Sequence, residues 1–521
     1  MSVKHCVAIA AISAPVVVSG CAVGPDFAAP AAPPVTRYTK ESLPSRTASS
    51  GVGFGESQRF LDGRDIPAEW WVLFRSRALN SLTKKAIEAN PTLQSALAAL
   101  RVANENMYAQ QGKYFPLVQA NFNPTRQQTP AALASPLASG GDVFNLITAQ
   151  VLVTYTFDTW GLNRRTVESL QALADSQRFQ AEAAYLTLTS NVVLAAIQEA
   201  ALRGQIDATN KLIDINSKML DLVRTQFDAG YANRNDVALQ EASLAQIKAT
   251  LPPLRKALAV QRNLLSTLAG SFPSQEPTET FKLDNLHLPT NLPVSLPAQL
   301  IRQRPDVRAA EEQLHSASAL VGVAVANMLP SLMITANRGY TAADLASLVA
   351  GPSIFWTVAG NATQTLFDGF SLLHTERSAK AAYQQAAWAY RNTVITAFQN
   401  VADSLRAIQN DADTLRAASE FEKAAKVSLD LAQLQMKTGQ ANFLVLLTAQ
   451  VTYEQAILQV VTAEANRLSD TAALFLALGG GWWNRVGPPV PEQNFNVATG
   501  QSTPAANDRN WLVEWWTDLH N

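Results

Sequence analysis

The chain has 521 residues, of which 16% are charged, and its formal net charge is −1. The charged share lies below the ~25% of an ordinary soluble domain, and no run of like charge stands out, so neither a nucleic-acid partner nor an acidic substrate is indicated. No uninterrupted apolar segment reaches the length of a spanning helix, which argues against a helical membrane protein. Such a chain can still enter a bilayer as a closed β-barrel, because a barrel satisfies every backbone group in lipid.

The N-terminus has the build of a cleaved secretory signal over residues 1–20: a weakly basic start, an apolar run and small residues before a cysteine. The run is shorter than the ~20 residues that a spanning helix needs. Val18-Ser19-Gly20-Cys21 is similar to a bacterial lipobox, in which Cys21 becomes the acylated N-terminus, and Ala22 differs from the Asp that marks inner-membrane retention. The alternative is an ordinary core cysteine after an apolar strand. Residues 27–66, rich in Pro, Ala, Ser and Gly, are expected to form an extended tether.

Most of the remaining chain is a duplication. Asn90-Pro91-Thr92-Leu93 recurs as Arg304-Pro305-Asp306-Val307, and a second proline follows at the same distance in each copy. A period this long indicates two copies of one domain-sized unit, not a short solenoid repeat. The further matched pairs are Pro116 with Pro330, Phe157-Asp158 with Phe367-Asp368, Gly230 with Gly439, and Leu268-Ala269-Gly270 with Ala477-Leu478-Gly479.

Each repeat begins with a helix followed by a strand pair. Helix-period apolar positions cover 77–112 in the first repeat and 299–328 in the second, each ending before the second proline. The β-rich segments that follow are 117–127 with 143–157, and 332–341 with 353–367.

The predicted strand 143–157 has one apolar face and one mostly polar face, as a strand between lipid and a watery lumen requires. When the two Phe-Asp pairs are aligned, the apolar residues of 353–367 match the positions of the mostly polar face of 143–157. Because a one-residue slip exchanges the faces of a strand, the mismatch predicts a bulge or a one-residue indel. These apolar residues are Ile354, Trp356, Val358 and Ala362.

The helical period then continues for an unusual length, over 162–229 and 371–438, without an internal proline. Each helix would be about 100 Å long, so it must lie against other helices. Gly230 and Gly439 are expected to end these helices in the left-handed conformation, and helices return at 232–269 and 441–478. A coiled-coil seam with steps of four and three residues is formed by Val401, Leu405, Ile408, Ala412 and Leu415.

Four strands are too few for a barrel, since about eight are needed for even a filled interior. A cyclic homotrimer would supply a 12-stranded barrel with an open lumen, continued by a tube of long helices. The predicted fold class is therefore a mixed α/β membrane protein built from two tandem repeats, with four strands per chain.

The residues that carry a family resemblance span nearly the whole chain. They are Cys21-Ala22-Val23-Gly24-Pro25-Asp26-Phe27, Trp70-Trp71-Val72-Leu73-Phe74, Leu79-Asn80-Ser81-Leu82, Leu300 to Glu311 with Arg304-Pro305-Asp306-Val307 at its centre, and Ala477-Leu478-Gly479-Gly480-Gly481-Trp482. In this order they resemble the outer membrane factor family, the TolC-like channels, and within it the NodT-type efflux lipoproteins.

The resemblance implies a non-enzymatic channel with no cofactor: a trimeric barrel in the outer membrane and a periplasmic α-helical coiled-coil barrel closed at its tip. Its implied partners are a periplasmic adaptor (membrane fusion) protein, an inner-membrane RND transporter and outer-membrane lipid, to which palmitate on Cys21 would anchor the chain. The implied function is a passive exit duct for drugs or toxic compounds, and hence multidrug resistance. The alternatives are the outlet of a type I protein-secretion system, and a lipid-anchored enzyme or structural coiled coil without a pore.

The expected domain boundaries follow from the repeat and the resemblance. They are 1–20 signal peptide, 21–76 lipid-anchored tether and equatorial segment, 77–270 first repeat, 271–298 inter-repeat linker and equatorial segment, 299–481 second repeat and 482–521 C-terminal equatorial tail.

The family's periplasmic gate lies just after the second Gly break, where this sequence departs from its relatives. Leu446-Leu447-Thr448-Ala449-Gln450 stands where relatives commonly read Leu-Leu-Asp-Ala-Gln, and Val445 stands where the TolC-like pattern carries an acid. Without a ring of aspartates, closure is expected to rest on an apolar constriction at Leu444, with Asp236 as the first repeat's remaining acid. The alternative is that Phe443, Leu444, Val445 and Leu447 are coiled-coil core and that Asp236 is a first-turn helix acid.

Other candidate sites have simpler interpretations. The histidines lack metal-ligand spacing, and no catalytic constellation stands out. Gly479-Gly480-Gly481 is expected to stop a helix. The basic cluster Arg302, Arg304 and Arg308 fits a solvated or salt-bridged face better than a docking patch, and Trp511, Trp515 and Trp516 fit an amphipathic end helix.

Overall fold

The structure, a computed structural model, describes residues 22–42, 44–128, 143–438, 440 and 443–487, and the backbone alone of 493–496 and 501–504. Cys21, the loop 129–141, Gly439 and the tail tryptophans Trp511, Trp515 and Trp516 lie outside the described residues. The chain divides into two compact units. One comprises the residues up to Ala29, Ala103–Ala174 and Glu312–Trp388, and the other comprises Pro30–Val102, Asp175–Glu311 and the residues from Ala389 onward.

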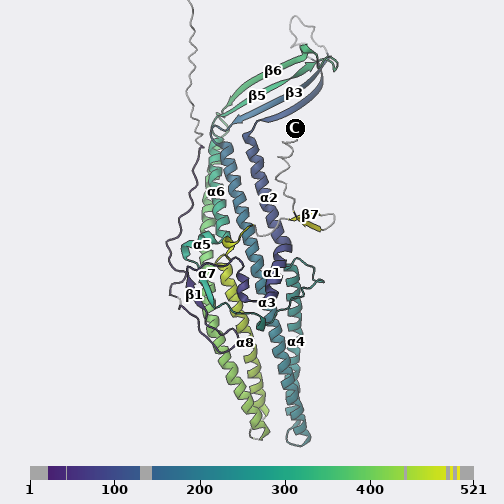
Figure 1. Cartoon of the computed structure of the whole chain (residues 1–521), viewed down its shortest axis with the longest axis vertical. Coiled ribbons are helices and arrows are strands. Elements are labelled where there is room, and N and C mark those ends of the chain that lie inside the picture. The colour runs from purple at the N-terminus through teal and green to yellow at the C-terminus, as the bar shows by residue number, and fades with distance from the viewer. Residues whose placement is uncertain are drawn as a thin grey trace, which may run out of the picture. The chain divides into compact units, whose positions relative to one another are not determined.

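The first unit contains a four-stranded antiparallel sheet in the order β2-β3-β5-β6 (Figure 1). Both predicted strand pairs are present, and the two repeats meet where β3 pairs with β5. The edge strands β2 and β6 each pair with one neighbour within the chain. The strands are β2 (Leu117–Gln128), β3 (Val143–Phe157), β5 (Ser331–Ala342) and β6 (Ile354–Thr363).

The sheet has one apolar face that continues across all four strands. Val153 lies opposite Ala336, which in turn lies opposite Val358, and cross-strand neighbours share a face. The same face carries Val118, Phe122, Ile147, Val151, Tyr155, Leu332, Ile334, Ile354 and Trp356, together with Arg126 and Arg338. The other face is mixed and carries Gln119, Asn121, Thr148, Gln150, Thr154, Thr335, Asn337, Thr341 and Asn361, together with Phe144, Leu146, Leu152, Met333 and Phe355.

Of the two explanations predicted for the parity mismatch, a bulge or a one-residue indel, the bulge is wrong for the residues that pair. The registers of β3 with β5 and of β5 with β6 run without interruption, so the apolar sets of β3 and β6 lie on one face despite their opposite parity. The mismatch arose from the alignment, because β3 ends at Phe157 itself whereas β6 ends at Thr363, before Phe367 is reached.

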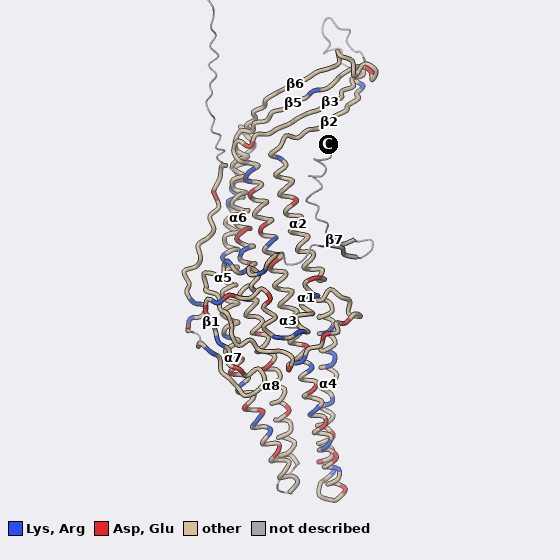
Figure 2. Tube along the Cα trace, viewed as in Figure 1, with Lys and Arg blue, Asp and Glu red and all other residues tan. Residues whose placement is uncertain are grey.

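Charge is almost absent from the sheet and frequent on the helices (Figure 2). Arg126 in β2 and Arg338 in β5 are the charged residues of these four strands. A charged side chain on a lipid-facing strand costs ~2–4 kcal/mol at mid-bilayer. Both arginines lie on the same face as the apolar residues, so it is the low overall charge of the sheet that fits a lipid-exposed structure.

Each helix predicted before a strand pair is two helices instead. The first is α1 (Arg77–Ala89) followed by α2 (Pro91–Gln111), and the second is α5 (Pro297–Gln303) followed by α6 (Pro305–Ala326). A proline has no N–H and restricts the residue before it, so it starts a new helix. Asn90 caps α2 by accepting from the backbone N–H groups of Thr92 and Leu93, at 2.9 and 3.2 Å.

The two long helices are present as predicted. α3 (Leu162–Asp228) and α7 (Ser371–Lys437) each have 67 residues. The Phe-Asp pairs of the duplication mark their starts: Asp158 accepts from the N–H of Asn163 at 2.8 Å, and Asp368 accepts from the N–H of Leu372 at 2.7 Å. A carboxylate at this position accepts from N–H groups that have no partner within the helix, and its negative charge is stabilised by the positive end of the helix dipole.

The far ends of the long helices close in the same way. Gly230 has φ +76°, and the N–H of Tyr231 donates to the carbonyl of Gln226, as in a Schellman ending. In the second repeat the N–H of Gln440 donates to the carbonyl of Gln435. The returning helices are α4 (Arg234–Leu268) and α8 (Phe443–Ala477), each of 35 residues. The predicted seam is confirmed, because Val401, Leu405, Ile408, Ala412 and Leu415 are all buried.

Several short elements complete the two units. β1 (Arg59–Asp62) pairs in parallel with β4 (Asn291–Val294). The predicted helix stop is confirmed, since Gly479, Gly480 and Gly481 all have positive φ. The remaining elements are the 3-10 helices η1 (Trp70–Phe74), η2 (Gly112–Tyr114), η4 (Leu283–Asn285), η5 (Gly351–Ser353) and η6 (Trp482–Asn484), and the strand pair β7 (Gln493–Asn496) and β8 (Gln501–Pro504).

Among the described helices, α8 alone is long and apolar enough to cross a membrane when judged by length and composition. Core helices of soluble proteins pass the same test. Leu446, Leu468 and Phe475 of α8 are fully buried within the chain, so one side of α8 packs in the second unit, although only 22% of its most apolar 18-residue stretch is buried there.

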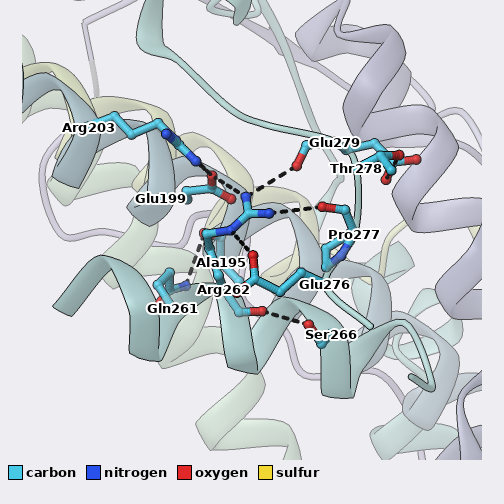
Figure 3. Close-up of polar contacts among 10 residues, drawn as sticks. All are labelled: Ala195, Glu199, Arg203, Gln261, Arg262, Ser266, Glu276, Pro277, Thr278 and Glu279. Atoms are coloured by element: carbon cyan, nitrogen blue, oxygen red, sulfur yellow. Dashed lines mark hydrogen bonds and ion pairs between the residues drawn. The ribbon is translucent and has the colours of Figure 1, made fainter. Parts of the chain in front are cut away.

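A buried carboxylate joins α3 to α4 in the second unit (Figure 3). Glu199 is fully buried, and its Oε1 accepts from Arg203 at 2.7 Å and from Arg262 at 3.1 Å. Arg262 also pairs with Glu276 at 2.7 Å and donates to the carbonyls of Pro277 and Glu279. One guanidinium therefore holds the inter-repeat linker against two helices.

We expect Arg262→Met to destabilise the protein by about 2 kcal/mol. The change leaves a buried carboxylate short of one partner, but Arg203 remains, so the loss should be smaller than the ~3–5 kcal/mol of a fully broken buried pair. Thermal unfolding of the purified protein measures it. Arg224→Met is the matched control, because Arg224 joins the same two helices through Glu241 at the surface and exposed pairs contribute little. Equal effects of the two variants would contradict the role given to Glu199.

Candidate functional site

The tip of the α7–α8 hairpin brings together three of the four residues predicted to form a gate. Leu444, Val445 and Thr448 line one open groove of about 380 Å³ with Ser428, Ala449 and Thr452. The groove is uncharged. The Thr448 hydroxyl donates to the carbonyl of Leu444 at 2.9 Å, so this polar group is partly satisfied within its own helix.

The side chains around the groove divide between core and surface. Phe443 and Leu446 are 4% and 0% exposed and belong to an apolar cluster with residues of α3, α4 and α7, and Leu447 packs against it. Leu444 and Val445 are 61% and 46% exposed. The coiled-coil interpretation therefore holds for Phe443 and Leu447, whereas Leu444 and Val445 remain partly exposed within their own chain.

Asp236 lies at the start of α4 and closes a capping box. Its backbone N–H donates to the side chain of Asn233 at 2.9 Å, and its carboxylate accepts from the N–H of Asn233 at 3.0 Å. Both bonds satisfy backbone N–H groups at the start of α4 that have no carbonyl partner within the helix. Asp236 thus has a structural role in the described chain, beside any role at an aperture.

Two of the three arginines of the basic cluster near the start of α6 form contacts within the chain. Arg304 pairs with Asp306 at 2.6 Å and donates to the carbonyl of Ala477 at 2.9 Å. Arg308 pairs with Glu311 at 2.6 Å and lies over the ring of Phe179. Of the cluster, Arg302 alone is solvent-exposed. The salt-bridged interpretation is therefore correct for Arg304 and Arg308.

A fully buried arginine in α8 was not foreseen. The guanidinium of Arg467 donates to the carbonyls of Phe54 and Glu56 at 2.7 and 2.6 Å, and to the hydroxyl of Thr47 at 3.2 Å. Burial lowers the pKa of Arg467. The predicted tether is therefore docked in this part, since residues 47–56 are fastened to α8. The sequence signal, one arginine inside an apolar helix, does not reveal partners so distant in the chain.

Two carboxyl groups near Arg467 resist ionisation. Burial, and next the adjacent carboxyl of Asp470, raise the pKa of Asp411 to about 7. Burial, with the charge of Asp284 beside it, raises the pKa of Glu464 to about 7. Neighbouring carboxyls out of water share protons because two close negative charges repel each other. Within the described residues, no group of three or more His, Cys, Asp or Glu side chains is arranged to hold a metal ion.

The family model described as "Outer membrane efflux protein" matches residues 82–271 and 296–480, which is most of the chain and both repeats. The chain belongs to the outer membrane efflux protein family. It is the outer-membrane channel of an efflux pump, a transport protein and not an enzyme, and it extends into the periplasm. The expected family and its TolC-like fold, with four strands per chain and two tandem repeats, are thus confirmed.

Two sequence relatives cover nearly the whole chain. The toluene efflux pump outer membrane protein TtgF of Pseudomonas putida is 27% identical over 491 residues, 93% of this chain and 98% of TtgF. Nodulation protein T of Rhizobium leguminosarum bv. viciae is 26% identical over 489 residues, 92% of this chain and 94% of that protein. The solved structure of the outer-membrane channel OprN has the same fold, with a TM-score of 0.77 at 24% identity, covering 89% of this chain and 100% of OprN.

The raised pKa values of Asp411 and Glu464 predict that the efflux channel is more stable near pH 5 than near pH 8. Between the unfolded pKa of an aspartate, about 4, and the folded value of about 7 for Asp411, the folded state binds more protons. Stability therefore falls as the pH rises through this window. In Asp411→Asn the melting temperature should depend less on pH. We expect the change to be on the order of 1 kcal/mol, since solvent screens a partly buried group.

Melting curves at pH 5, 6, 7 and 8 provide the measurement. Asp413→Asn is the matched control, because Asp413 lies on the same helix, is 59% exposed and pairs with Arg416 at the surface. If the melting temperature of Asp411→Asn depends on pH as strongly as that of the natural chain, the raised pKa does not belong to Asp411.

Proposed function

We propose that three copies of this chain form one exit duct, with a shared 12-stranded barrel and a shared periplasmic tube of helices. The observation that carries this proposal is the open sheet. Its apolar face is continuous, while β2 and β6 each have one unpaired edge within the chain. Unpaired backbone groups are not tolerated in lipid, and a barrel has no edges. Three sheets joined edge to edge would pair every strand.

We propose further that the duct docks to a periplasmic adaptor protein and an inner-membrane RND transporter, which deliver drugs or other toxic small molecules. The similarity to the toluene efflux protein TtgF over 93% of this chain supports this choice. The outlet of a type I protein-secretion system is the alternative in the same fold. Neighbouring genes for an adaptor and a proton-driven transporter would favour efflux.

Two further proposals concern the boundaries of the chain's parts. Cys21, after removal of residues 1–20, would carry palmitate and anchor the protein in the outer membrane, with 21–76 as tether and equatorial segment. The repeats would span 77–270 and 299–481, joined by the linker 271–298 and followed by the tail 482–521. The pattern of Val18-Ser19-Gly20-Cys21 supports the anchor.

We propose that the periplasmic end is closed by an apolar ring near Leu444, flanked by Val445 and Thr448, rather than by a ring of acids. Leu444 and Val445 are exposed on the α7–α8 tip and line an uncharged groove. In a trimer each would occur three times around one opening, where dewetting blocks ions. Asp236 is the remaining candidate for a charged contribution, although its carboxylate also caps α4.

The protein extracted in mild detergent should be a trimer. Its mass by light scattering is expected to be roughly three times the 56.2 kDa of the precursor chain, less the signal. Ion conductance in planar bilayers should accompany the trimer and would be missing from an enzyme or a structural coiled coil. A monodisperse monomer whose strand amides remain protected from exchange would overturn the shared barrel.

Cys21→Ser should abolish incorporation of labelled palmitate. Insertion into the outer membrane should survive, because twelve strands bury far more apolar surface than acyl chains supply at ~0.8 kcal/mol per CH₂. Metabolic labelling followed by membrane fractionation measures both. Label retained by the serine variant would disprove the lipobox assignment.

Leu444→Ser should raise the resting single-channel conductance several-fold, with little change in ion selectivity, because water would wet the constriction. The double change Val445→Asp and Thr448→Asp should instead increase cation selectivity and make the conductance sensitive to divalent cations, since each chain would add two carboxylates to one narrow opening.

The competing role of Asp236 is separated by two variants. Asp236→Asn keeps an oxygen for the capping box but removes the charge, whereas Asp236→Ala removes both. An apolar gate predicts that Asp236→Asn leaves the currents unchanged. Opening of the pore by Asp236→Asn, together with no effect of Leu444→Ser, would refute the apolar gate.

A further inference from the structure

The residues that directly follow Cys21 are not free in the described chain. Within the first unit, Ala22–Asp26 lie against the start of α3 and the last turns of α6. The N–H of Val23 donates to the carbonyl of Trp160 at 3.0 Å. Phe27 stacks on the ring of His315 in α6, with centroids 4.3 Å apart and an interplanar angle of 13°. A segment that was expected to be a tether is thus held by backbone and side-chain contacts.

Arg165 is the centre of this contact. Its side chain is 5% exposed, and a buried guanidinium needs partners for its donors. Nε donates to the carbonyl of Val23 at 3.1 Å, and Nη2 donates to the carbonyl of Gly24 at 3.4 Å and to Asp26 Oδ1 at 2.7 Å. Nη1 pairs with Glu168 at 2.8 Å. Three of these four contacts would vanish if the N-terminal segment departed.

Two glycines make room for the segment. Gly161 has φ +78°, and a Cβ on it would lie 2.6 Å from the Cβ of Ala22. Gly322 is inside α6, where glycine costs ~1 kcal/mol relative to alanine. A Cβ on Gly322 would lie 2.8 Å from the carbonyl oxygen of Val23 and 2.9 Å from the Cγ of Arg165. The close approach of the N-terminal backbone explains a glycine that the helix itself does not favour.

The site lies where both repeats pass between helix and strand. Trp160 and Gly161 stand between the end of β3 and the start of α3. The indole of Trp160 donates to the carbonyl of Pro330 at 2.8 Å, directly before β5 begins. Asp158, in the same turn, caps α3.

We propose that Trp160, Gly161, Arg165 and Gly322 form a seat for the chain's own mature N-terminal segment, which fixes Ala22 at the strand–helix junction. Because consecutive Cα atoms are about 3.8 Å apart, holding Ala22 in place also limits how far an acyl group on the preceding residue can be from the seat. An acyl group on Cys21 would then enter the bilayer beside the strands of its own chain, not at the end of a loose tether. This role rests on the proposed acylation, whereas the seat itself does not.

Amide hydrogen exchange on the mature trimer in detergent tests the seat. Peptides that contain Val23 should be protected in the natural chain and should exchange roughly tenfold faster or more in Arg165→Gln and in Gly322→Ala. Arg178→Gln is the control, because Arg178 lies on the same helix and is 51% exposed beside Asp175. Exchange at the unstructured rate in the natural chain, or unchanged protection in both seat variants, would overturn the proposal.

The sign of the Gly322→Ala effect gives a second, independent readout. In the natural chain the added methyl group should lower the melting temperature by displacing the N-terminal segment. In a chain whose residues 22–26 are replaced by Ser-Gly-Ser-Gly-Ser, the same change should raise it, because alanine is the better helix former. The same sign in both backgrounds would refute a steric role for the seat.

Acylation and seating can be told apart with Cys21→Ser. The seat predicts that the Val23 amide stays protected in this variant, and that Arg165→Gln still incorporates palmitate, since processing precedes folding. Protection lost in Cys21→Ser would mean that the acyl chains hold the segment, and the seat would be refuted. A natural chain that lacks label but keeps the protection would refute the anchor alone.

Discussion

The constraint on which the rest of this structure depends is that backbone hydrogen-bonding groups must be satisfied out of water. The four strands pair with one another without interruption, yet β2 and β6 keep one open edge each within a single chain. In lipid such an edge is far more costly than in water. The duplication supplies the strands in pairs, and the same requirement supports the closure by further copies of the chain that we propose.

The duplicated landmarks are the places where backbone groups lose their regular partners. Asp158 and Asp368 cap the starts of the two long helices. Pro91 and Pro305 occupy the first position of a new helix, where no N–H is missed. Residues between these landmarks diverge more freely, since an apolar surface can be formed by many side chains. The two repeats therefore resemble each other most where helices begin and end.

Two buried arginines hold the N-terminal segment by its backbone. Arg165 in α3 donates to the carbonyls of Val23 and Gly24, and Arg467 in α8 donates to those of Phe54 and Glu56. A guanidinium carries several donors in fixed directions, so it can bind a segment that has no regular structure of its own. Glu199 and Arg262 serve the inter-repeat linker in a similar way. Irregular segments of this chain are thus fixed by single charged side chains, while the helices and strands are fixed by repeated apolar contacts.

The sequence by itself determined the duplication, the order of helices and strands, the long helices with their glycine ends and the buried seam, because each follows from local periodicity and backbone chemistry. It also indicated the family, through motifs spread over the chain, and the candidate gate residues Leu444, Val445, Thr448 and Asp236. Only the tertiary structure decided the registers that put the apolar residues of β3 and β6 on one face, the exposure of Leu444 beside the burial of Phe443, and the partners of Arg165, Arg262 and Arg467. Val23, Glu199 and Phe54, which these three arginines bind, lie far from them in the chain. A single sequence carries no signal for contacts that depend on how distant segments pack.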